Sequence, residues 1–578
     1  MKILGIHDGH NASACLLDEG IIKIVLQEER LRREKNYFGF PERAIETILF
    51  ETGTDISDID YVAMNGKHMP PFFGEREDKM KTYRELATPK GTLRATTVQS
   101  LKKTPLYNMY IKKRKWERLK CLRKMGILEE KIVFVEHHEA HASAAYFGFP
   151  WWKKEKVLVI TCDGAGDGIC ATINIGENGN LRRIVSIPEK ESIAWYYGML
   201  TFVMGMIPNE HEYKIMGLAP YAPQKSREIA FERFNNLMEF KGGTLEWKRK
   251  RGIPPAAYSY HFIRELTELL RFDWIAAGIQ MWVEKFASEW VRSAIKRTGI
   301  RKVALSGGLF MNVKVNKAIS EIPELEDIFI FPSCGDESNS IGAAYALYAE
   351  KCKELGMDIN IEPLGPIYFG TDIKNSEVEQ MLSHMKGSSI EYYTDMDKEI
   401  GKLLADGKIV ARCRGRMEFG ARALGNRSIL ADPSNMEVIR IINNMIKNRD
   451  FWMPFAPTIL KERESDYIIK HKDVHSPYMM MTFDSNKGNY RDMIAALHQE
   501  DLTTRPQILE KDCNIGYYKV IKEFERRTGR GVILNTSFNL HGYPIVRSVE
   551  DALWVFENSG LEYLAIGDYL VYKDKYLR

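Results

Sequence analysis

The sequence predicts an α/β protein built around a duplicated unit, and three observations indicate this fold class. An apolar strand, a polar glycine loop, a second strand, a turn and a third strand follow one another in residues 2–30. The same order recurs in residues 156–187. Later, strands run into glycine-containing turns and then into helices at residues 302–316 and 327–347. Strands that alternate with helices in this way are typical of α/β folds.

Length and composition exclude several classes of protein. The 578 residues suffice for two to four domains, and a net charge of +4 is too small to predict a general affinity for nucleic acid. No apolar run approaches the roughly 20 residues of a membrane helix, and the first residues are not typical of a signal peptide. The eight cysteines are scattered without a C-x-x-C pair. We therefore expect reduced thiols and a cytoplasmic protein with no membrane contact.

The duplicated unit suggests two halves that face one another. Its Asp-Gly loops and glycine turns offer backbone N–H groups to phosphates. This organisation is similar to that of the actin, hexokinase and Hsp70 class, called ASKHA, in which a nucleotide lies between two such halves. A duplicated β-unit without a ligand remains the alternative.

Residues 79–125, between the two copies, are strongly basic. One interpretation is a surface for RNA, phospholipid or an anionic substrate. We favour the other interpretation, a solvated helical insertion, because aromatic residues are sparse among the cations.

Three histidines lie within five positions at the start of residues 135–150: His137, His138 and His141. Residues four apart lie on one helix face, so His137 and His141 are a candidate pair of metal ligands. A polar helix start whose histidines only form hydrogen bonds is the alternative. An alanine-rich turn is expected to follow them.

Carboxylates at strand ends could complete a metal site. Asp163 lies in the second Asp-Gly loop, and Asp336 follows a strand at the entrance to a helix. Two imidazoles with two carboxylates suit iron or zinc better than magnesium. Between these carboxylates in the sequence, Gly307, Gly308 and Asn312 form a strand-to-helix turn of the kind that presents backbone amides to a nucleotide.

A second chemical cluster follows a domain boundary that we place near residues 352–366, where glycine and proline interrupt the pattern. Residues 410–435 combine five arginines with glycines, and residues 446–460, 498–505 and 531–546 add further basic, amide and hydroxyl groups. Arginine forks are suited to phosphates and carboxylates. A structural arginine network is the alternative, and no Walker A motif occurs.

The motifs closely resemble those of the O-carbamoyltransferases of the NodU/CmcH/TobZ type along nearly the whole chain. The segments that carry this resemblance are HDGHNASACLL, QEERLRREKN, HHEAHASAAY, SGGLFMNVKVN, CGDESNSIGAA, GRMEFGARALGNRSIL, FWMPFAPTIL and ILNTSFNLHGYPIV. GRMEFGARALGNRSIL and NTSFN are the most specific of them.

The resemblance implies two fused domains. Residues 1–360 would form a Kae1-like ASKHA domain that transfers the carbamoyl group, and residues 361–578 would form a YrdC-like α/β domain that makes carbamoyl-adenylate. ATP and carbamoyl phosphate would be the substrates, with Mg2+ accompanying ATP. The acceptor would be a hydroxyl of a small molecule or sugar.

The resemblance also assigns residues. His10 matches the general base that deprotonates the acceptor, and Lys35 matches a residue near the carbamoyl and acceptor site. His137, His141, Asp163 and Asp336 match the ligands of a divalent metal, Fe2+ ahead of Zn2+ or Mn2+. The residues that match contacts to carbamoyl phosphate and ATP are Arg416, Glu418, Arg422, Arg427, Lys447, Arg449, Arg505, Asn535 and Ser537.

Some positions depart from the family pattern. Asn11, Ala421 and Met453 stand where relatives often have aspartate, proline and arginine, and residues 497–507 match loosely. Two alternatives stay open: a transferase of the tRNA threonylcarbamoylation type, which only the basic insertion favours, and a nucleotide-dependent ASKHA binding protein. Nucleic acid is not the expected partner, and a homodimer is one assembly open to the chain.

Overall fold

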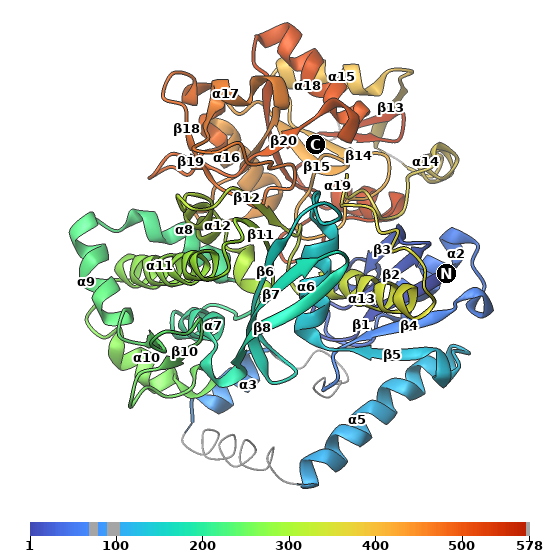
Figure 1. The fold of residues 1–578 in the computed structure, drawn as a ribbon. Coiled ribbons are helices and arrows are strands. Elements are labelled where there is room, and N and C mark those ends of the chain that lie inside the picture. Colours follow the sequence, from blue (N-terminus) through green and yellow to red (C-terminus); the bar gives the residue numbers. More distant parts are fainter. Residues whose placement is uncertain (69–78, 89–104, 386, 574–578) are drawn as a thin grey trace. The chain divides into compact units, whose positions relative to one another are not determined.

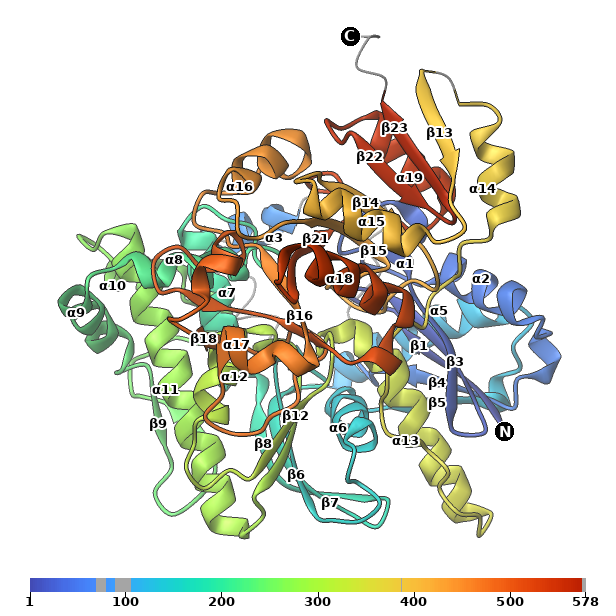
Figure 2. The same cartoon turned by 90° about the horizontal axis from the view of Figure 1, so that it is seen from above.

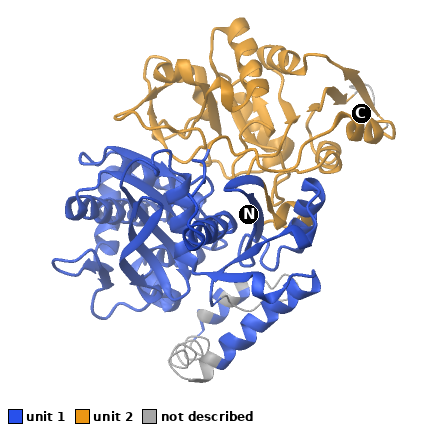
Figure 3. Cartoon of the chain, turned by 45° about the vertical axis from the view of Figure 1, so that its right-hand side comes forward, with its two compact units in different colours: residues 1–23, 36–364 blue, residues 24–35, 365–578 orange. Residues whose placement is uncertain are grey.

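A computed structural model describes residues 1–68, 79–88, 105–385 and 387–573, so residues 89–104 of the basic insertion lie outside the described residues. The chain forms two compact units (Figure 3). Unit 1 comprises residues 1–23 and 36–364, and unit 2 comprises residues 24–35 and 365–578. No helix in the described part of the chain combines the length and apolar character needed to cross a membrane.

Unit 1 contains two five-stranded sheets with the same strand order (Figure 1). In each sheet the first strand pairs antiparallel with the second and parallel with the fourth, and the fourth pairs parallel with the fifth. The first sheet has the order β3-β2-β1-β4-β5, formed by Ile21–Gln27, Ser13–Asp18, Lys2–His7, Tyr61–Asn65 and Ile132–Val135. The second has the order β12-β11-β6-β7-β8, formed by Asp327–Ile330, Lys302–Ser306, Val157–Gly166, Ile169–Glu177 and Asn180–Pro188.

Helices α6 (His137–Gly148) and α13 (Asn339–Glu354) pack against each other between these sheets (Figure 2). Helix α13 covers β1, β2 and β4, whereas α6 covers β6, β7 and β11. A glycine permits the close approach of the two helices, because a Cβ at Gly342 would lie 1.9 Å from the carbonyl oxygen of Ala140. The first turns of the two helices meet, because the Asn339 amide of α13 lies 3.1 Å from Nε2 of His141 in α6.

The other helices of unit 1 surround the sheets, and α9 and α12 pack on the long helix α11. These helices are α2 (Glu42–Thr52), α3 (Lys79–Leu86), α5 (Pro105–Lys124), α7 (Ile193–Val203), α8 (Glu212–Leu218), α9 (Gln224–Phe234), α10 (Tyr260–Leu266), α11 (Phe272–Thr298) and α12 (Val313–Ser320). A small hairpin joins β9 (Met238–Phe240) to β10 (Trp247–Arg249).

Unit 2 is built on an eight-stranded sheet with a core on each face. Successive side chains of a strand point to opposite faces, so Val410 joins one core and Ala411 the other. The strand order is β13 (Ser388–Tyr392), β23 (Tyr569–Lys573), β22 (Tyr563–Ile566), β14 (Val410–Cys413), β15 (Arg427–Ala431), β21 (Val532–Ser537), β16 (Ala456–Leu460) and β20 (Gln507–Leu509).

Helices line both faces of this sheet. Ile400 of α15 and Phe524 of α18 belong to the core that contains Val410, and Phe556 of α19 belongs to the other core. The helices are α14 (Asn375–Leu382), α15 (Met396–Ala405), α16 (Glu437–Ile442), α17 (Glu464–Tyr467), α18 (Ile515–Thr528) and α19 (Val549–Glu557). A small sheet contains β17 (Ile468–Ile469), β18 (Phe483–Ser485) and β19 (Thr503–Thr504).

The grouping of residues 24–35 with unit 2 departs from the expected division after residue 360. The buried guanidinium of Arg30, in α1 (Glu28–Arg32), donates to the carbonyl oxygens of Glu418 and Gly420. The Gln27 side chain accepts the Gly420 N–H at 3.1 Å. These long-range bonds hold an N-terminal segment to the second unit, and sequence patterning carries no signal of them.

Several local expectations are confirmed and one is wrong. The turns between the second and third strands of the two copies, near residues 18–20 and 177–180, and the two strand-to-helix passages are present. All eight cysteines are free thiols. The alanine-rich stretch after His141 is not a turn: α6 continues to Gly148, since alanine is the best helix former and these alanines are buried.

Candidate metal centre

The histidine pair lies at the first turns of α6. Glu136 caps this helix, and its carboxylate accepts the N–H groups of His138 and Glu139 at 3.0 and 2.9 Å. An acidic N-cap satisfies free amides and opposes the positive end of the helix dipole. His137 and His141 follow one turn apart, both buried, with ring centroids 4.8 Å apart. The i, i+4 spacing therefore places both imidazoles on one face.

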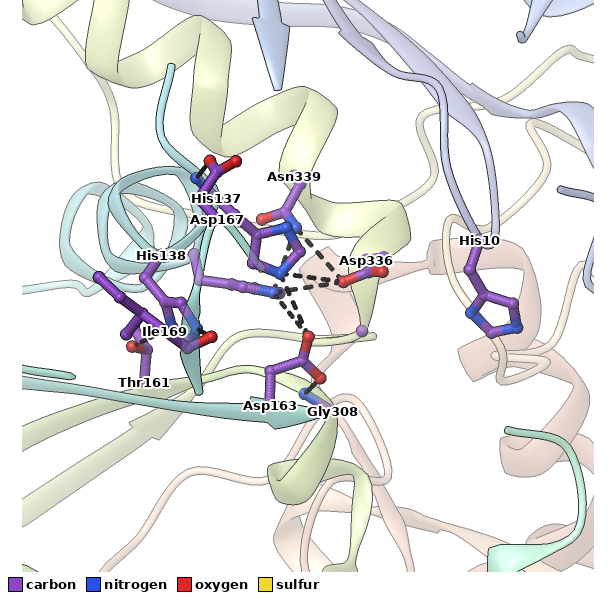
Figure 4. Close-up of polar contacts among 12 residues, drawn as sticks. His10, His137, His138, Thr161, Asp163, Asp167, Ile169, Gly308, Asp336 and Asn339 are labelled. Carbon is purple, nitrogen blue, oxygen red and sulfur yellow. Dashed lines mark hydrogen bonds and ion pairs between the residues drawn. The ribbon is translucent and has the colours of Figure 1, made fainter. Parts of the chain in front are cut away.

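Two carboxylates meet this pair. Nε2 of His137 lies 3.2 Å from Oδ2 of Asp163 and 3.4 Å from Oδ1 of Asp336. Nε2 of His141 lies 3.8 and 3.5 Å from the same two oxygens. One donor atom from each of the four residues lies within 4.8 Å of all the others. Figure 4 shows both carboxylates directed toward the imidazoles.

Neighbouring groups orient these side chains. Nδ1 of His141 lies 3.1 Å from the Ser306 hydroxyl, so a hydrogen bond there leaves Nε2 available to a ligand. Oδ1 of Asp163 accepts the Gly308 N–H at 3.0 Å, which directs Oδ2 toward the histidines. The backbone N–H of His137 donates to Asp167 at 2.9 Å. Neighbouring groups thus hold the side chains of His141 and Asp163 and the backbone of His137.

His138 has a different role. Its Nδ1 lies 2.8 Å from the Thr161 hydroxyl and its Nε2 lies 3.1 Å from the Ile169 carbonyl oxygen. Figure 4 shows His138 beside these two residues. Burial, followed by the neighbouring histidines, lowers the pKa of His138 well below its usual value. A neutral ring that donates from Nε2 and accepts at Nδ1 satisfies both contacts, so His138 is a structural histidine.

The charges in this cluster are strongly coupled. Burial opposes protonation of His137, but Asp336 and Asp163 outweigh it and raise its pKa to about 9. The pKa of His141 is also raised, by hydrogen bonds to Asp163 and Asp336 against the effect of burial. The pKa of Asp163 is well below its usual value, because the histidine bonds outweigh burial. The protonated imidazoles thus neutralise the carboxylates, as a bound metal cation could.

The donor set fits a divalent transition metal. Imidazole suits zinc, copper, iron and nickel, and a mixed set of two imidazoles and two carboxylates is not a magnesium site. The half-buried carboxylates of Asp163 and Asp336 lie close together, which costs free energy unless a positive charge lies between them. Residues His137, His141, Asp163 and Asp336 would hold the ion, as the sequence resemblance predicts.

A histidine that the sequence did not single out lies beside this group. His7 ends β1, is fully buried, and lies 3.9 Å from Oδ2 of Asp336. Its Nδ1 contacts the Asn65 amide at 2.8 Å and its Nε2 contacts the His10 carbonyl oxygen at 2.9 Å. Burial lowers the pKa of His7, so we assign a neutral ring that donates from Nε2. The HDGH spacing was its only sequence signal.

The predicted catalytic residue, His10, lies in the loop between β1 and β2. Its backbone bridges to Phe38, and its side chain is half-buried. Asn11, next to it, adopts a left-handed conformation with φ of 58° and donates to Glu337 at 3.3 Å. Figure 4 shows His10 on this loop, apart from the histidine pair of α6.

The predicted nucleotide turn of unit 1 supports the metal group and a helix. Gly307 has φ of 107°, and a Cβ there would lie 2.3 Å from the Cys162 carbonyl oxygen, so only glycine fits. The Asn312 side chain caps α12 by accepting the N–H groups of Lys314 and Val315. Contact of these residues with a nucleotide stays a prediction.

The arginines and lysines of the unit 2 cluster divide into two groups, and the first is structural. Arg412 and Arg414 both bind Asp397, and Arg414 also binds Asp568. Arg427 is fully buried and donates to backbone carbonyl oxygens, among them that of Gly415 at 2.9 Å. The alternative of an arginine network that bridges loops therefore applies to these three.

Glu418 is also engaged within the unit. It is fully buried, and its carboxylate accepts the N–H groups of Leu424 and Arg427 at 2.7 and 3.2 Å. Arg416 is exposed and donates to the carbonyl oxygens of Phe369 and Gly370 at 2.9 and 3.1 Å.

The second group is a set of cations close enough to repel one another. Burial lowers the pKa of Lys447 well below its usual value, with Arg449 and Lys35 adding to the shift. Burial, Arg422 and Arg449 likewise lower the pKa of Arg505. Buried like charges are costly unless an anion compensates them. This arrangement favours anion binding by unit 2, where the structure also places Lys35.

Polar groups of the NTSFN segment adjoin these cations. Nζ of Lys447 donates to Oγ of Ser537 at 3.1 Å and to Oδ1 of Asn539 at 2.7 Å. Nη2 of Arg449 donates to the Thr536 hydroxyl at 3.0 Å. The amide of Asn535 donates to the carbonyl oxygen of Ala423 at 3.1 Å. The segments predicted to act together in unit 2 thus lie side by side.

Comparisons with known proteins match both the N-terminal and the C-terminal parts of this chain. The family model described as carbamoyltransferase N-terminus matches residues 2–345, and the one described as carbamoyltransferase C-terminus matches residues 401–573. An uncharacterized protein of Methanocaldococcus jannaschii is 31% identical, with 99% of this chain and 100% of that protein aligned. Nodulation protein NolNO of Sinorhizobium fredii is 30% identical, with 98% of this chain and 79% of that protein aligned.

A likeness to solved structures is weaker. The crystal structure of full-length HypF in its phosphate- and nucleotide-bound form is 14% identical, covers 61% of this chain and 46% of that one, and has a TM-score of 0.34. That score is too low to assign the fold.

Proposed function

The chain belongs to the carbamoyltransferase family, and from that premise we propose an ATP-dependent O-carbamoyltransferase whose two half-reactions take place in its two units. Unit 2 would form carbamoyl-adenylate, and unit 1 would transfer the carbamoyl group to an acceptor hydroxyl. The observation that carries the proposal is that each unit holds its own polar site: buried cations that lower one another's pKa lie together in unit 2, and the four-donor group lies in unit 1.

The fold supports this assignment. Both sheets of unit 1 share one strand order, with helices α6 and α13 packed between them, which favours the duplicated ASKHA architecture of a Kae1-like domain. The eight-stranded mixed sheet of unit 2 suits a YrdC-like domain. Nucleotide binding by either unit is part of the proposal.

The adenylation step needs positive charge in a shielded place. Carbamoyl phosphate loses its phosphate to water, and a carbamate oxygen then attacks the α-phosphorus of ATP while the bond to pyrophosphate breaks. Arg505, Arg449 and Lys447 would hold the phosphate oxygens as negative charge moves onto them. Their mutual repulsion, relieved by the bound anions, favours this role. Mg2+ would accompany ATP.

The transfer step needs a base and a polarised carbamoyl group. A divalent metal held by His137, His141, Asp163 and Asp336 would supply Lewis acidity. His10 would take the proton from the acceptor hydroxyl, whose oxygen attacks the carbamoyl carbon as the bond to AMP breaks. Imidazole suits this role because it titrates near neutral pH. We propose Fe2+ as the metal and a small-molecule or sugar hydroxyl as the acceptor.

Pyrophosphate release tests the adenylation half directly. Full-length protein loaded with Fe2+ is incubated with ATP and Mg2+, with and without carbamoyl phosphate. We expect pyrophosphate only when carbamoyl phosphate is present, together with an equal amount of inorganic phosphate. Release of ADP instead, or no release, would reject the adenylation mechanism. A screen of hydroxylated compounds for the mass of one added carbamoyl group then identifies the acceptor.

A further inference from the structure

Arg118 is the buried cation of α5, the helix of the basic insertion. Arg118 is 3% exposed, and Leu119 and Leu122 of the same helix are also buried. Other cations of the helix, such as Arg114 and Arg123, pair with glutamates nearer the surface. A buried arginine is uncommon unless its donors are fully used.

The partners of Arg118 come from three other elements of unit 1. Nε donates to Oδ2 of Asp8 at 2.7 Å and Nη2 donates to Oδ1 at 2.8 Å, which forms a two-pronged ion pair. Nη1 and Nη2 also donate to the carbonyl oxygens of Gly66 and Asn65 at 2.5 Å. The guanidinium lies 4.9 Å from the ring of Phe134 in β5. The fork therefore joins α5 to the ends of β1 and β4.

The position of Asp8 gives this ion pair its significance. Asp8 lies between His7, which contacts Asp336 and Asn65, and the loop that carries His10. Arg118 thus holds both Asp8 and the backbone of Asn65, whose side chain binds His7. At the other end of the loop, Asn11 donates to the Glu337 carboxylate at 3.3 Å. Hydrogen bonds therefore hold the loop at both ends: Arg118 binds Asp8 at its start, and Asn11 binds Glu337 at its end.

We propose that Arg118 is a positioning residue, which acts through Asp8 to hold the His7–His10 loop beside the metal centre. Its contribution to transfer rests on the proposed function of His10. This role gives one cation of the basic insertion, Arg118, a structural function that needs no partner on the outer surface of α5. A displacement of about 1 Å in a reacting group can cost roughly a hundredfold in rate, so a loose loop would slow transfer.

The test compares Arg118→Lys, Asp8→Asn and the double variant with Arg123→Lys as a matched control on the same helix. Lysine keeps the charge but loses the planar fork. Arg123 pairs with Glu129 at the surface, where a lost contact matters little. Transfer kcat, pyrophosphate release, metal content and hydrogen exchange of peptides covering residues 7–12 are measured on folded, full-length protein.

We expect Arg118→Lys to lower transfer kcat by about tenfold to a hundredfold and to speed exchange in residues 7–12. Pyrophosphate release and metal content should match the wild type. If the two residues act as one pair, the double variant should lose no more than the worse single variant. Arg123→Lys should change none of these quantities.

Other outcomes overturn the inference. Unchanged exchange in residues 7–12 in the folded Arg118→Lys protein would show that Arg118 does not hold the loop. An equal fall in pyrophosphate release and transfer would indicate a general structural role. If the wild type transfers no carbamoyl group, the proposed function fails, whereas the exchange measurement still decides whether Arg118 holds the loop.

Discussion

Nε2 of His137 lies 3.2 Å from Oδ2 of Asp163, although the two residues are 26 positions apart in the chain. The contact joins the first turn of α6 to the end of β6. It exists because α6 packs on the sheet that contains β6, which brings the helix start to the strand end. The packing of one helix on one sheet thus brings together two of the four proposed metal ligands.

The adjacent histidines offer a matched series. We expect His137→Gln and His141→Gln to lower metal affinity at least tenfold, because each removes a donor nitrogen. His138→Gln should retain the metal, since His138 binds Thr161 and Ile169 instead. Metal content after dialysis, measured by elemental mass spectrometry on folded protein, checks this. Equal loss in all three variants would contradict the assignment.

Metal binding should release protons. The carboxylates raise the pKa of His137 to about 9, so at pH 7 its imidazole is protonated in the metal-free protein and must lose that proton to bind a cation. His141, whose pKa is also raised, adds to the release. Apparent affinity should therefore fall as pH falls below about 9. Calorimetry in buffers of different ionisation enthalpy should find about one to two protons released per metal at pH 7. No proton release would contradict this.

A substitution that changes none of the four metal ligands should also weaken metal binding. A Cβ at Gly166 would lie 2.1 Å from Cγ of His137, so Gly166→Ala forces the ring to move. We expect reduced metal content in protein that still folds. Gly168→Ala is the control, because nothing lies within 4 Å of its Cβ, although its φ of +85° should cost about 1 kcal/mol of stability. Equal metal loss in both variants would contradict this explanation.

The local elements of this structure could be predicted from the sequence. Alternation and turn residues predicted the hairpins around β1 and β6, and the i, i+4 spacing predicted one face for His137 and His141. Local pattern made Asp163 and Asp336 candidates because ligands collect at strand ends in α/β folds, and the family resemblance named them as metal ligands. Their approach to the histidines depends on helix packing, which requires glycine at position 342 because a Cβ there would meet the backbone of Ala140.

Other features had little or no local signal. His7 ends an apolar strand, and the HDGH spacing was its only sequence signal; its buried contacts with Asn65 and the His10 carbonyl oxygen distinguish it in the structure. Arg118 is one cation among many on a basic helix, and its burial depends on Asp8, 110 residues away. The arginines of residues 410–435 looked alike, yet Arg414 is neutralised by two aspartates while Arg422 lies among cations. Tertiary partners decide each of these cases.

The central claim is that two half-reactions are catalysed by different residues in different units. Its most direct test measures pyrophosphate release and carbamoyl transfer side by side in His10→Ala and Arg505→Met. We expect His10→Ala to retain pyrophosphate release and to lose transfer by about 10²–10⁴-fold, as for a missing general base. Arg505→Met should lose pyrophosphate release by about 10²-fold, as for a missing charge at a transition state. Equal loss of both activities in His10→Ala would contradict the account.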